Sequence, residues 1–120
     1  MTAADPGNVF YESNVVACGT CASGSRVQYL GQGHYIVLNV RNVPVAGPRT
    51  LTITYECNTP RTFLVSVNDT VPVSLLLDGA GDWLTPAQAT MPITLPAGDS
   101  QIKFFNNADP APDLDQILIS

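Results

Sequence analysis

The sequence has few basic residues and only one histidine. Its 120 residues include five Lys or Arg side chains against ten acidic ones, which gives a net charge of −5. Because the cations are spread along the chain, no basic stripe is available to neutralise phosphates, and nucleic acid is not expected as a partner. No run approaches the roughly 18 to 20 apolar residues of a membrane span, so no membrane partner is expected either.

The scarcity of histidine also bears on catalysis. Ser/His/Asp or Cys/His chemistry and most zinc sites would have to be built around His34, the one histidine of the chain. His34 follows Gly33 in a glycine-rich segment, where an exposed turn residue is expected. The sequence therefore indicates a protein that is not an enzyme.

Helical patterns are absent, whereas strand patterns are abundant. Leu51, Ile53, Tyr55 and Cys57 alternate with polar residues, which places four apolar groups on one face of a half-buried strand and the threonines on the outward face. Similar short segments recur between Gly- and Pro-containing turns, for about nine strands in all. With 45 % hydrophobic and 12 % charged residues, the chain is expected to fold as one monomeric, all-β domain over 1–120, an antiparallel β-sandwich or jelly roll. Residues 1–7 are expected to be a flexible leader.

Three cysteines leave one without a partner. Cys18 and Cys21 flank a Gly-Thr pair in a loop-like segment that does not open a helix, so a structural disulfide is favoured over a redox-active pair. Such a bond points to an oxidising, secreted setting. Cys57 lies on the apolar face of its strand and is expected to be a buried free thiol.

A carboxylate near the C-terminus suggests a cation site. The period of two puts Asp115 on the same strand face as Ile117 and Ile119, where an unpaired charge is costly. Glu12 and Asn14 share a strand face near the other end, and side-by-side terminal strands would bring three oxygen ligands together for calcium. The alternative is that these are surface residues at strand ends that hydrogen-bond loop amides.

Several short motifs occur in order along nearly the whole chain. They are Tyr11-Glu12-Ser13-Asn14, the segment from Ser23 to Gly31, the segment from Val43 to Leu51, Gly81-Asp82-Trp83, the segment from Leu95 to Ile102, and Ala111-Pro112-Asp113-Leu114-Asp115-Gln116-Ile117. This series resembles the carbohydrate-binding modules of family 35 and family 6. The cysteine pair before Ser23 further resembles the modules appended to α-galactosidase-like glycoside hydrolases.

The resemblance implies a jelly roll, a structural calcium at Glu12, Asn14 and Asp115, and a sugar site at the loop end of the sandwich. Asn14 stands where the family has a second glutamate, which removes one charge from the calcium set. In the sugar site, Tyr29 and Trp83 correspond to aromatic residues that stack on a sugar ring, although each could instead be a packing residue. Asp113 corresponds to a ligand-binding asparagine, and Asn107 in the preceding loop is a further candidate for binding hydroxyl groups.

These observations favour a non-catalytic module that binds a polysaccharide or oligosaccharide and is covalently linked to a secreted glycoside hydrolase. A carboxylate at position 113 offers only acceptors, which disfavours acidic sugars and favours galactosides, xylans or mannans. The alternative is a structural or protein-interaction β-sandwich that braces a catalytic domain and binds no sugar. Few aromatic residues are available for stacking, which favours that alternative.

Overall fold

The computed structural model describes residues 1–120 and contains ten strands and no helix. The strands are β1 (Val9–Tyr11), β2 (Asn14–Ala17), β3 (Ser25–Gln28), β4 (Tyr35–Val43), β5 (Gly47–Glu56), β6 (Arg61–Val67), β7 (Val73–Leu77), β8 (Ala87–Leu95), β9 (Gly98–Phe105) and β10 (Asp113–Ile119). All nine expected segments contain a strand. The tenth strand, β2, was not expected, because it follows β1 after a break of only two residues.

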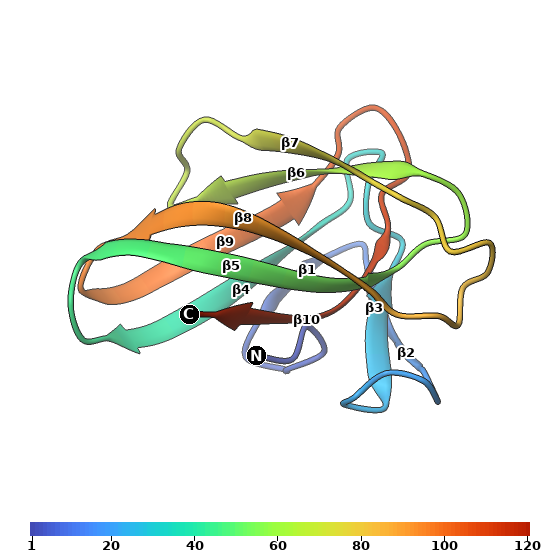
Figure 1. Ribbon diagram of the computed structural model, residues 1–120, viewed down its shortest axis with the longest axis horizontal. Coiled ribbons are helices and arrows are strands. Elements are labelled where there is room, and N and C mark those ends of the chain that lie inside the picture. The colour runs from blue at the N-terminus through green and yellow to red at the C-terminus, as the bar shows by residue number, and fades with distance from the viewer.

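The strands form two five-stranded antiparallel sheets that face each other (Figure 1). One sheet has the order β1-β4-β9-β6-β7, and the other has the order β2-β3-β10-β5-β8. The expected antiparallel β-sandwich is therefore confirmed. No helix of the length and hydropathy needed to cross a bilayer is present.

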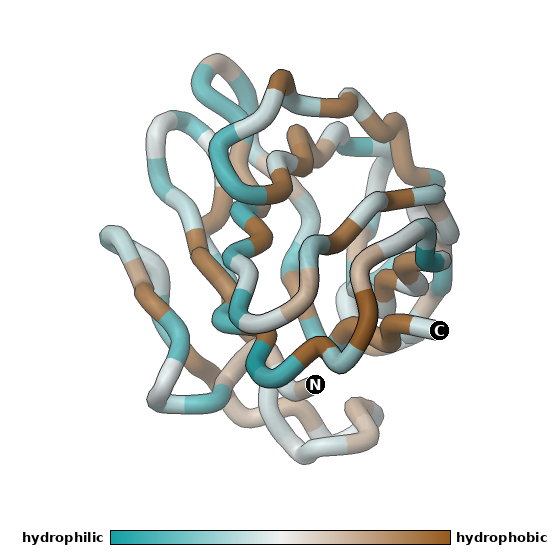
Figure 2. The backbone as a smooth tube through the Cα atoms, turned by 90° about the vertical axis from the view of Figure 1, so that its left-hand side faces the viewer, coloured by the Kyte–Doolittle hydropathy of each residue, from teal (hydrophilic) through white to brown (hydrophobic).

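Period-two alternation builds the core between the sheets. On β5 the side chains of Leu51, Ile53 and Tyr55 are buried against inward residues of the other sheet, such as Phe63 and Phe104. Figure 2 shows the resulting alternation of hydrophobic and hydrophilic residues along the chain. Burial of this apolar area is the main stabilising contribution to the fold.

The outward face of β5 differs from the expectation at its C-terminal end. Thr50 is exposed, but Thr54 is buried and Glu56 has no exposed surface. Glu56 pairs across the ladder with Asp113 of β10, and one of its carboxylate oxygens lies within 4.8 Å of the Cys18 and Cys21 sulfur atoms. The β2–β3 loop therefore covers this end of the sheet.

The first three residues of the chain pair with β10. Thr2 forms a β-bridge with Gln116, the Ala3 N–H donates to the Asp115 carbonyl at 2.9 Å, and the Ile117 N–H donates to the Met1 carbonyl at 2.9 Å. Ala3 is fully buried. These backbone groups complete the free part of the β10 edge, which ties down the first three of the seven residues that were expected to form a flexible leader.

The loop after β3 and the loop before β10 are joined by backbone hydrogen bonds. The Ala111 N–H donates to the Leu30 carbonyl at 2.8 Å, and the Gln32 N–H donates to the Asp109 carbonyl at 3.0 Å. Gly31 lies between these bonds with φ of +98°, and a Cβ there would lie 2.4 Å from Ala111 N and from the Asp109 oxygen. Only glycine permits this approach.

Replacement of Gly31 by alanine is therefore expected to separate the two loops. We expect Gly31→Ala to lower the free energy of unfolding by about 2 kcal/mol, because positive φ and a steric clash act together. Gly33→Ala is the matched control, since Gly33 also has positive φ but open space around its Cβ position. Urea denaturation of both variants measures the difference, and equal losses would contradict a role for the close approach.

Candidate functional site

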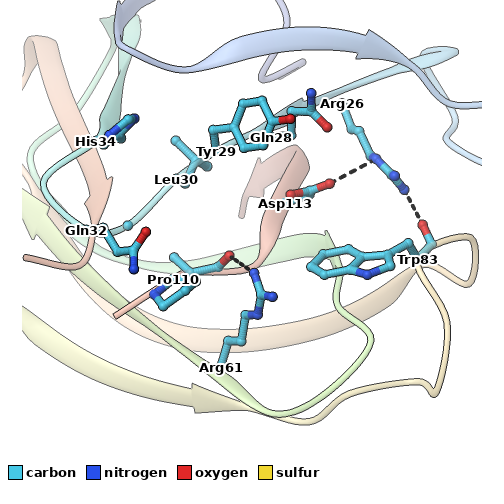
Figure 3. Close-up of a pocket in the computed structure, with 12 residues that line it drawn as sticks. Arg26, Gln28, Tyr29, Leu30, Gln32, His34, Arg61, Trp83, Pro110 and Asp113 are labelled. Carbon is cyan, nitrogen blue, oxygen red and sulfur yellow. Dashed lines mark hydrogen bonds and ion pairs between the residues drawn. The ribbon is translucent and has the colours of Figure 1, made fainter. Parts of the chain in front are cut away.

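The loops at one end of the sandwich surround a cavity of about 430 Å³ (Figure 3). It is lined by residues of β3 and the following loop, β6, the β7–β8 loop, and β10 with the preceding loop: Arg26, Gln28, Tyr29, Leu30, Gly31, Gln32, His34, Arg61, Trp83, Pro110, Ala111 and Asp113. Three residues expected in a sugar site, Tyr29, Trp83 and Asp113, lie in this one cavity. Its size and mixed lining are typical of small-molecule sites.

Trp83 forms one wall of the cavity from the β7–β8 loop. Asp82 fixes this loop, because its carboxylate accepts the Leu84 and Thr85 N–H groups at 2.8 Å each. These hydrogen bonds also lower the pKa of Asp82. The guanidinium carbon of Arg61 lies 4.7 Å from the centre of the Trp83 ring, a cation–π contact. Trp83 itself is only half-buried, so it is not sealed in the core.

Asp113 and Arg26 form an ion pair at the base of the cavity. Arg26 Nε lies 3.0 Å from Asp113 Oδ2, and the two side chains are 13 % and 9 % exposed. Arg26 also donates a hydrogen bond to the Trp83 carbonyl, which ties the tryptophan loop to β3. Burial raises the pKa of Asp113 to about 6, although Arg26 and Arg61 oppose this rise.

Tyr29 lies over the cavity at the end of β3. Its side chain is 64 % exposed, and its φ of 60° places a bulky residue in the left-handed region. Such backbone conformations are uncommon for non-glycine residues and occur often at binding sites. The exposed ring is therefore available for a ligand and is not a packing residue beneath the loop.

Other candidate residues lie outside the cavity or have a structural role. Asn107 is exposed and does not line the cavity. Asn106 is buried, donates to the Thr62 carbonyl at 3.1 Å and accepts two N–H groups of its own loop. His34 lines the cavity edge and lies 3.6 Å from the carboxylate of Glu12.

The expected calcium ligands do not form one cluster. The terminal strands are not side by side, because β1 pairs with β4, β2 pairs with β3, and β3 separates β2 from β10. Glu12 is exposed and faces His34, and Asn14 is exposed on β2, whereas Asp115 is 1 % exposed. The segment beside Asp115 is Met1 to Ala3, which has no carboxylate side chain.

A β-bulge explains the actual position of Asp115. The register of β10 against β5 shifts between Leu114 and Gln116, so Leu114 and Ile117 both enter the core and Asp115 does not share their face. The Asp115 carboxyl group instead faces that of Glu56. The prediction from strict alternation, that Asp115 shares a strand face with Ile117 and Ile119, was therefore wrong.

Glu56 and Asp115 form a buried pair of acids. Both oxygens of Glu56 and Oδ1 of Asp115 are buried and have no hydrogen-bond partner. Burial raises the pKa of Glu56 to about 7, with a further rise from Asp115, and burial also raises the pKa of Asp115. Unpaired buried carboxylates are costly and call for a proton or a cation. The Cys18 and Cys21 sulfur atoms near Glu56 are joined in a disulfide and are not thiolate ligands.

The disulfide between Cys18 and Cys21 closes the β2–β3 loop, and Cys57 is a buried free thiol on the core face of the sheet. The loop backbone supports this closure, because the Cys21 N–H donates to the Cys18 carbonyl at 3.2 Å.

Several cavity residues were not recognised in the sequence as parts of a site. Arg26 and Gln28 lie two residues apart on β3 and both reach the cavity, and Arg61 reaches it from β6, although none of the three was expected in a sugar site. Arg61 does donate to the Ala111 carbonyl at 3.2 Å, but it also lies against Trp83. One signal in the sequence could have pointed to these arginines as site residues. The chain has only five Lys or Arg residues, and an arginine is rarely buried without a partner.

No family model matches the sequence, and no curated protein matches it. Solved structures with the same fold include a family 35 carbohydrate binding module from Clostridium thermocellum, with 23 % identity and a TM-score of 0.95 over all of this chain and 96 % of that one. A CBM35 from Paenibacillus barcinonensis has 17 % identity and a TM-score of 0.89, and the match covers 100 % of this chain and 96 % of that one. An exo-beta-1,3-galactanase from Phanerochaete chrysosporium has 22 % identity and a TM-score of 0.90. The match covers all of this chain and only 28 % of the galactanase chain.

These likenesses define the class of fold, a jelly-roll β-sandwich. More particularly, the chain has the fold of the family 35 carbohydrate-binding modules over its whole length. The resemblance of the motifs to that family is confirmed at the level of the fold.

Proposed function

We propose that the protein is a non-catalytic carbohydrate-binding module whose sugar site is the cavity beside Trp83. The proposal rests on one observation, the meeting of two accessible aromatic rings, Tyr29 and Trp83, with several polar side chains in a single cavity. A pyranose has an apolar C–H face and a rim of hydroxyl groups, so it needs this combination of surfaces. The shared fold with family 35 modules supports the same function.

The polar residues of the cavity suit hydroxyl recognition. Gln28 and Gln32 offer both donors and acceptors, and Arg61 offers donors alone. Asn107 is not part of this set and is no longer proposed as a sugar ligand. A small, partly open site of this kind is expected to bind a single sugar with a dissociation constant of roughly micromolar to millimolar magnitude.

The module would act by holding a linked catalytic domain at a glycan surface. In the exo-beta-1,3-galactanase from Phanerochaete chrysosporium the matching part is 28 % of the chain, and that protein was solved with beta-1,3-galactotriose in one structure and with galactose in another. Linkage to a catalytic domain raises the local concentration of enzyme on its substrate. The disulfide supports a secreted setting, and we propose a monomer.

The test is binding of purified protein to a glycan array, followed by calorimetric titration of the positive sugars.

Neutral galactosides, xylans and mannans were favoured on the assumption that Asp113 is free to accept hydrogen bonds. Since Asp113 is paired with Arg26, this preference loses its main support. An array without any signal, together with stabilisation of an adjacent domain, would instead favour the bracing role.

Calcium is proposed as a structural ion, with a changed ligand set. The set of Glu12, Asn14 and Asp115 does not fit, whereas Glu56 and Asp115 together present three buried oxygens without partners. Calcium takes oxygen ligands and would offset the charge of these acids. Glu56 is thus the residue that would join Asp115.

We expect calcium to raise the melting temperature of the protein by several degrees and chelation to reverse the rise, because a ligand at 100 times its dissociation constant adds about 2.7 kcal/mol to stability. Glu56→Gln should abolish the response, whereas Glu12→Gln, a change at an exposed position, should retain it. Differential scanning fluorimetry measures both. An absent response in the unmodified protein would exclude the ion, and loss of the response in Glu12→Gln alone would restore the original ligand set.

A further inference from the structure

Two sulfur atoms and a buried carboxylate meet where the β2–β3 loop covers the end of β5. One donor atom from each of Cys18, Cys21 and Glu56 lies within 4.8 Å of the other two, and all three residues are buried. None of the three lines the cavity beside Trp83. The cluster is therefore a separate feature of the molecule, and the sugar site does not explain it.

The carboxylate of Glu56 lacks the partners that its burial requires. Glu56 has no exposed surface, and neither of its oxygens has a hydrogen-bond partner. Asp115 faces it and adds a further buried oxygen without a partner. Arg26 does not supply the missing charge, because it is already paired with Asp113 at 3.0 Å. An acid in this environment needs a proton or a cation.

The two sulfur atoms stand at the spacing of metal ligands. Two residues separate Cys18 from Cys21, and many zinc sites take a pair of thiolates from such a segment. The disulfide now occupies both sulfur atoms. The loop backbone has support of its own, because the Cys18 N–H donates to the Gly24 carbonyl at 2.9 Å and the Gly24 N–H donates to the Cys21 carbonyl at 3.0 Å. Reduction would therefore leave two thiols close to Glu56.

These three donors suit zinc once the thiols are available. Tetrahedral zinc has bonds of about 2.0 to 2.3 Å, so its ligand atoms lie about 3.4 to 3.8 Å apart. Rotation of the side chains is enough to bring donors within 4.8 Å of one another to that geometry. Thiolates are soft ligands that favour zinc over calcium, and a divalent ion also offsets the charge of the carboxylate. The fourth position is left for a water molecule.

We propose that reduction of the disulfide creates a zinc site made of Cys18, Cys21 and Glu56. Two equivalents of a thiol break the S–S bond by exchange and leave as their own disulfide, and the two protein sulfur atoms take up two electrons and two protons. Zinc then displaces both thiol protons to solvent and binds the two thiolates and the carboxylate. The covalent bond closes the β2–β3 loop in the oxidised protein, and the metal closes it in the reduced protein. The proposal is independent of the sugar site.

The test measures metal binding in the two redox states. A trialkylphosphine reduces the purified protein and is itself oxidised to the phosphine oxide, with water as the source of oxygen. In calorimetric titrations with zinc chloride, the reduced protein should bind one equivalent at least a hundredfold more tightly than the oxidised protein. Cobalt(II), an optical probe of the same site, should show thiolate-to-metal charge-transfer absorption only after reduction. Equal zinc affinity of the two forms would overturn the proposal.

The folding of the reduced protein is followed by circular dichroism. The short loop closed by the disulfide predicts that the reduced chain stays folded, because a short loop contributes less stabilisation than a long one. If the reduced chain is unfolded without metal, one equivalent of zinc should restore the spectrum of the oxidised protein. Failure of zinc to restore it would also overturn the proposal.

Variants identify the ligands. Glu56→Gln should weaken zinc binding at least tenfold, whereas Glu12→Gln, at an exposed position, is the matched control and should leave it unchanged. Cys57→Ala removes the third thiol and should change neither the affinity nor the cobalt spectrum. Cys18→Ser with Cys21→Ser should lose zinc binding and keep any response to calcium, which separates the two metal proposals. Full zinc affinity in a folded Glu56→Gln, or its loss in Cys57→Ala, would overturn the ligand set.

Discussion

Trp83→Ala is expected to reduce sugar affinity at least tenfold while the domain stays folded. The ring supplies an apolar wall of the cavity and is only half-buried, so its loss removes more from the ligand than from the core. A tenfold loss corresponds to about 1.4 kcal/mol of binding free energy. The bond from Arg26 goes to the backbone carbonyl of residue 83 and survives the substitution. Calorimetric titration with the best array glycan measures the change.

Leu84→Ala provides the control for Trp83→Ala. Leu84 is the next residue in the same loop, is 60 % exposed and does not line the cavity, so its removal should leave affinity unchanged. Unfolding of Trp83→Ala would identify the tryptophan as a packing residue. Full affinity in a folded Trp83→Ala would place the sugar elsewhere on the sandwich.

Asp113→Ala is expected to destabilise the protein by about 3 kcal/mol, because it leaves the Arg26 guanidinium without a counter-ion. The Arg26 side chain is 13 % exposed, and an arginine cannot lose its proton to escape this cost. The removal of one partner of a buried pair is costly even where the pair itself contributes little. Urea denaturation measures the loss. Sugar affinity should fall as well, since Arg26 ties the Trp83 loop to β3.

Two comparisons test the origin of that loss. Asp99→Ala removes an exposed partner of Arg41, and a much smaller change in the urea midpoint is expected. The double variant Arg26→Met with Asp113→Leu should recover more than half of the stability, because no unpaired charge remains. A loss in Asp113→Ala no larger than that in Asp99→Ala would show that the ion pair is not buried in solution.

The strands and the core could be predicted from the sequence because both depend on local alternation. Leu51, Ile53 and Tyr55 are buried as expected. The alternation failed where the backbone departs from it, as at the bulge that moves Asp115 out of the core face. A bulge adds one residue to the ladder, and the composition of β10 does not reveal it.

The site was predicted in part. The aromatic residues Tyr29 and Trp83 were found through motifs, and both line the cavity. Arg61 was not expected in the site, and the calcium ligands were placed on the assumption that the terminal strands are neighbours. Residue spacing does not specify which strands become neighbours in a sandwich, so Glu56, far from Asp115 in the sequence, was missed as its partner.

By itself, the sequence determined that this protein is an all-β domain with a single core, because period-two patterning and Gly and Pro turns act over a few residues. The tertiary structure alone decided the electrostatics. It paired Arg26 with Asp113, left Arg61 free beside Trp83 and buried Glu56 against Asp115. Charges interact through space, so their partners depend on strand order and loop packing and not on distance along the chain.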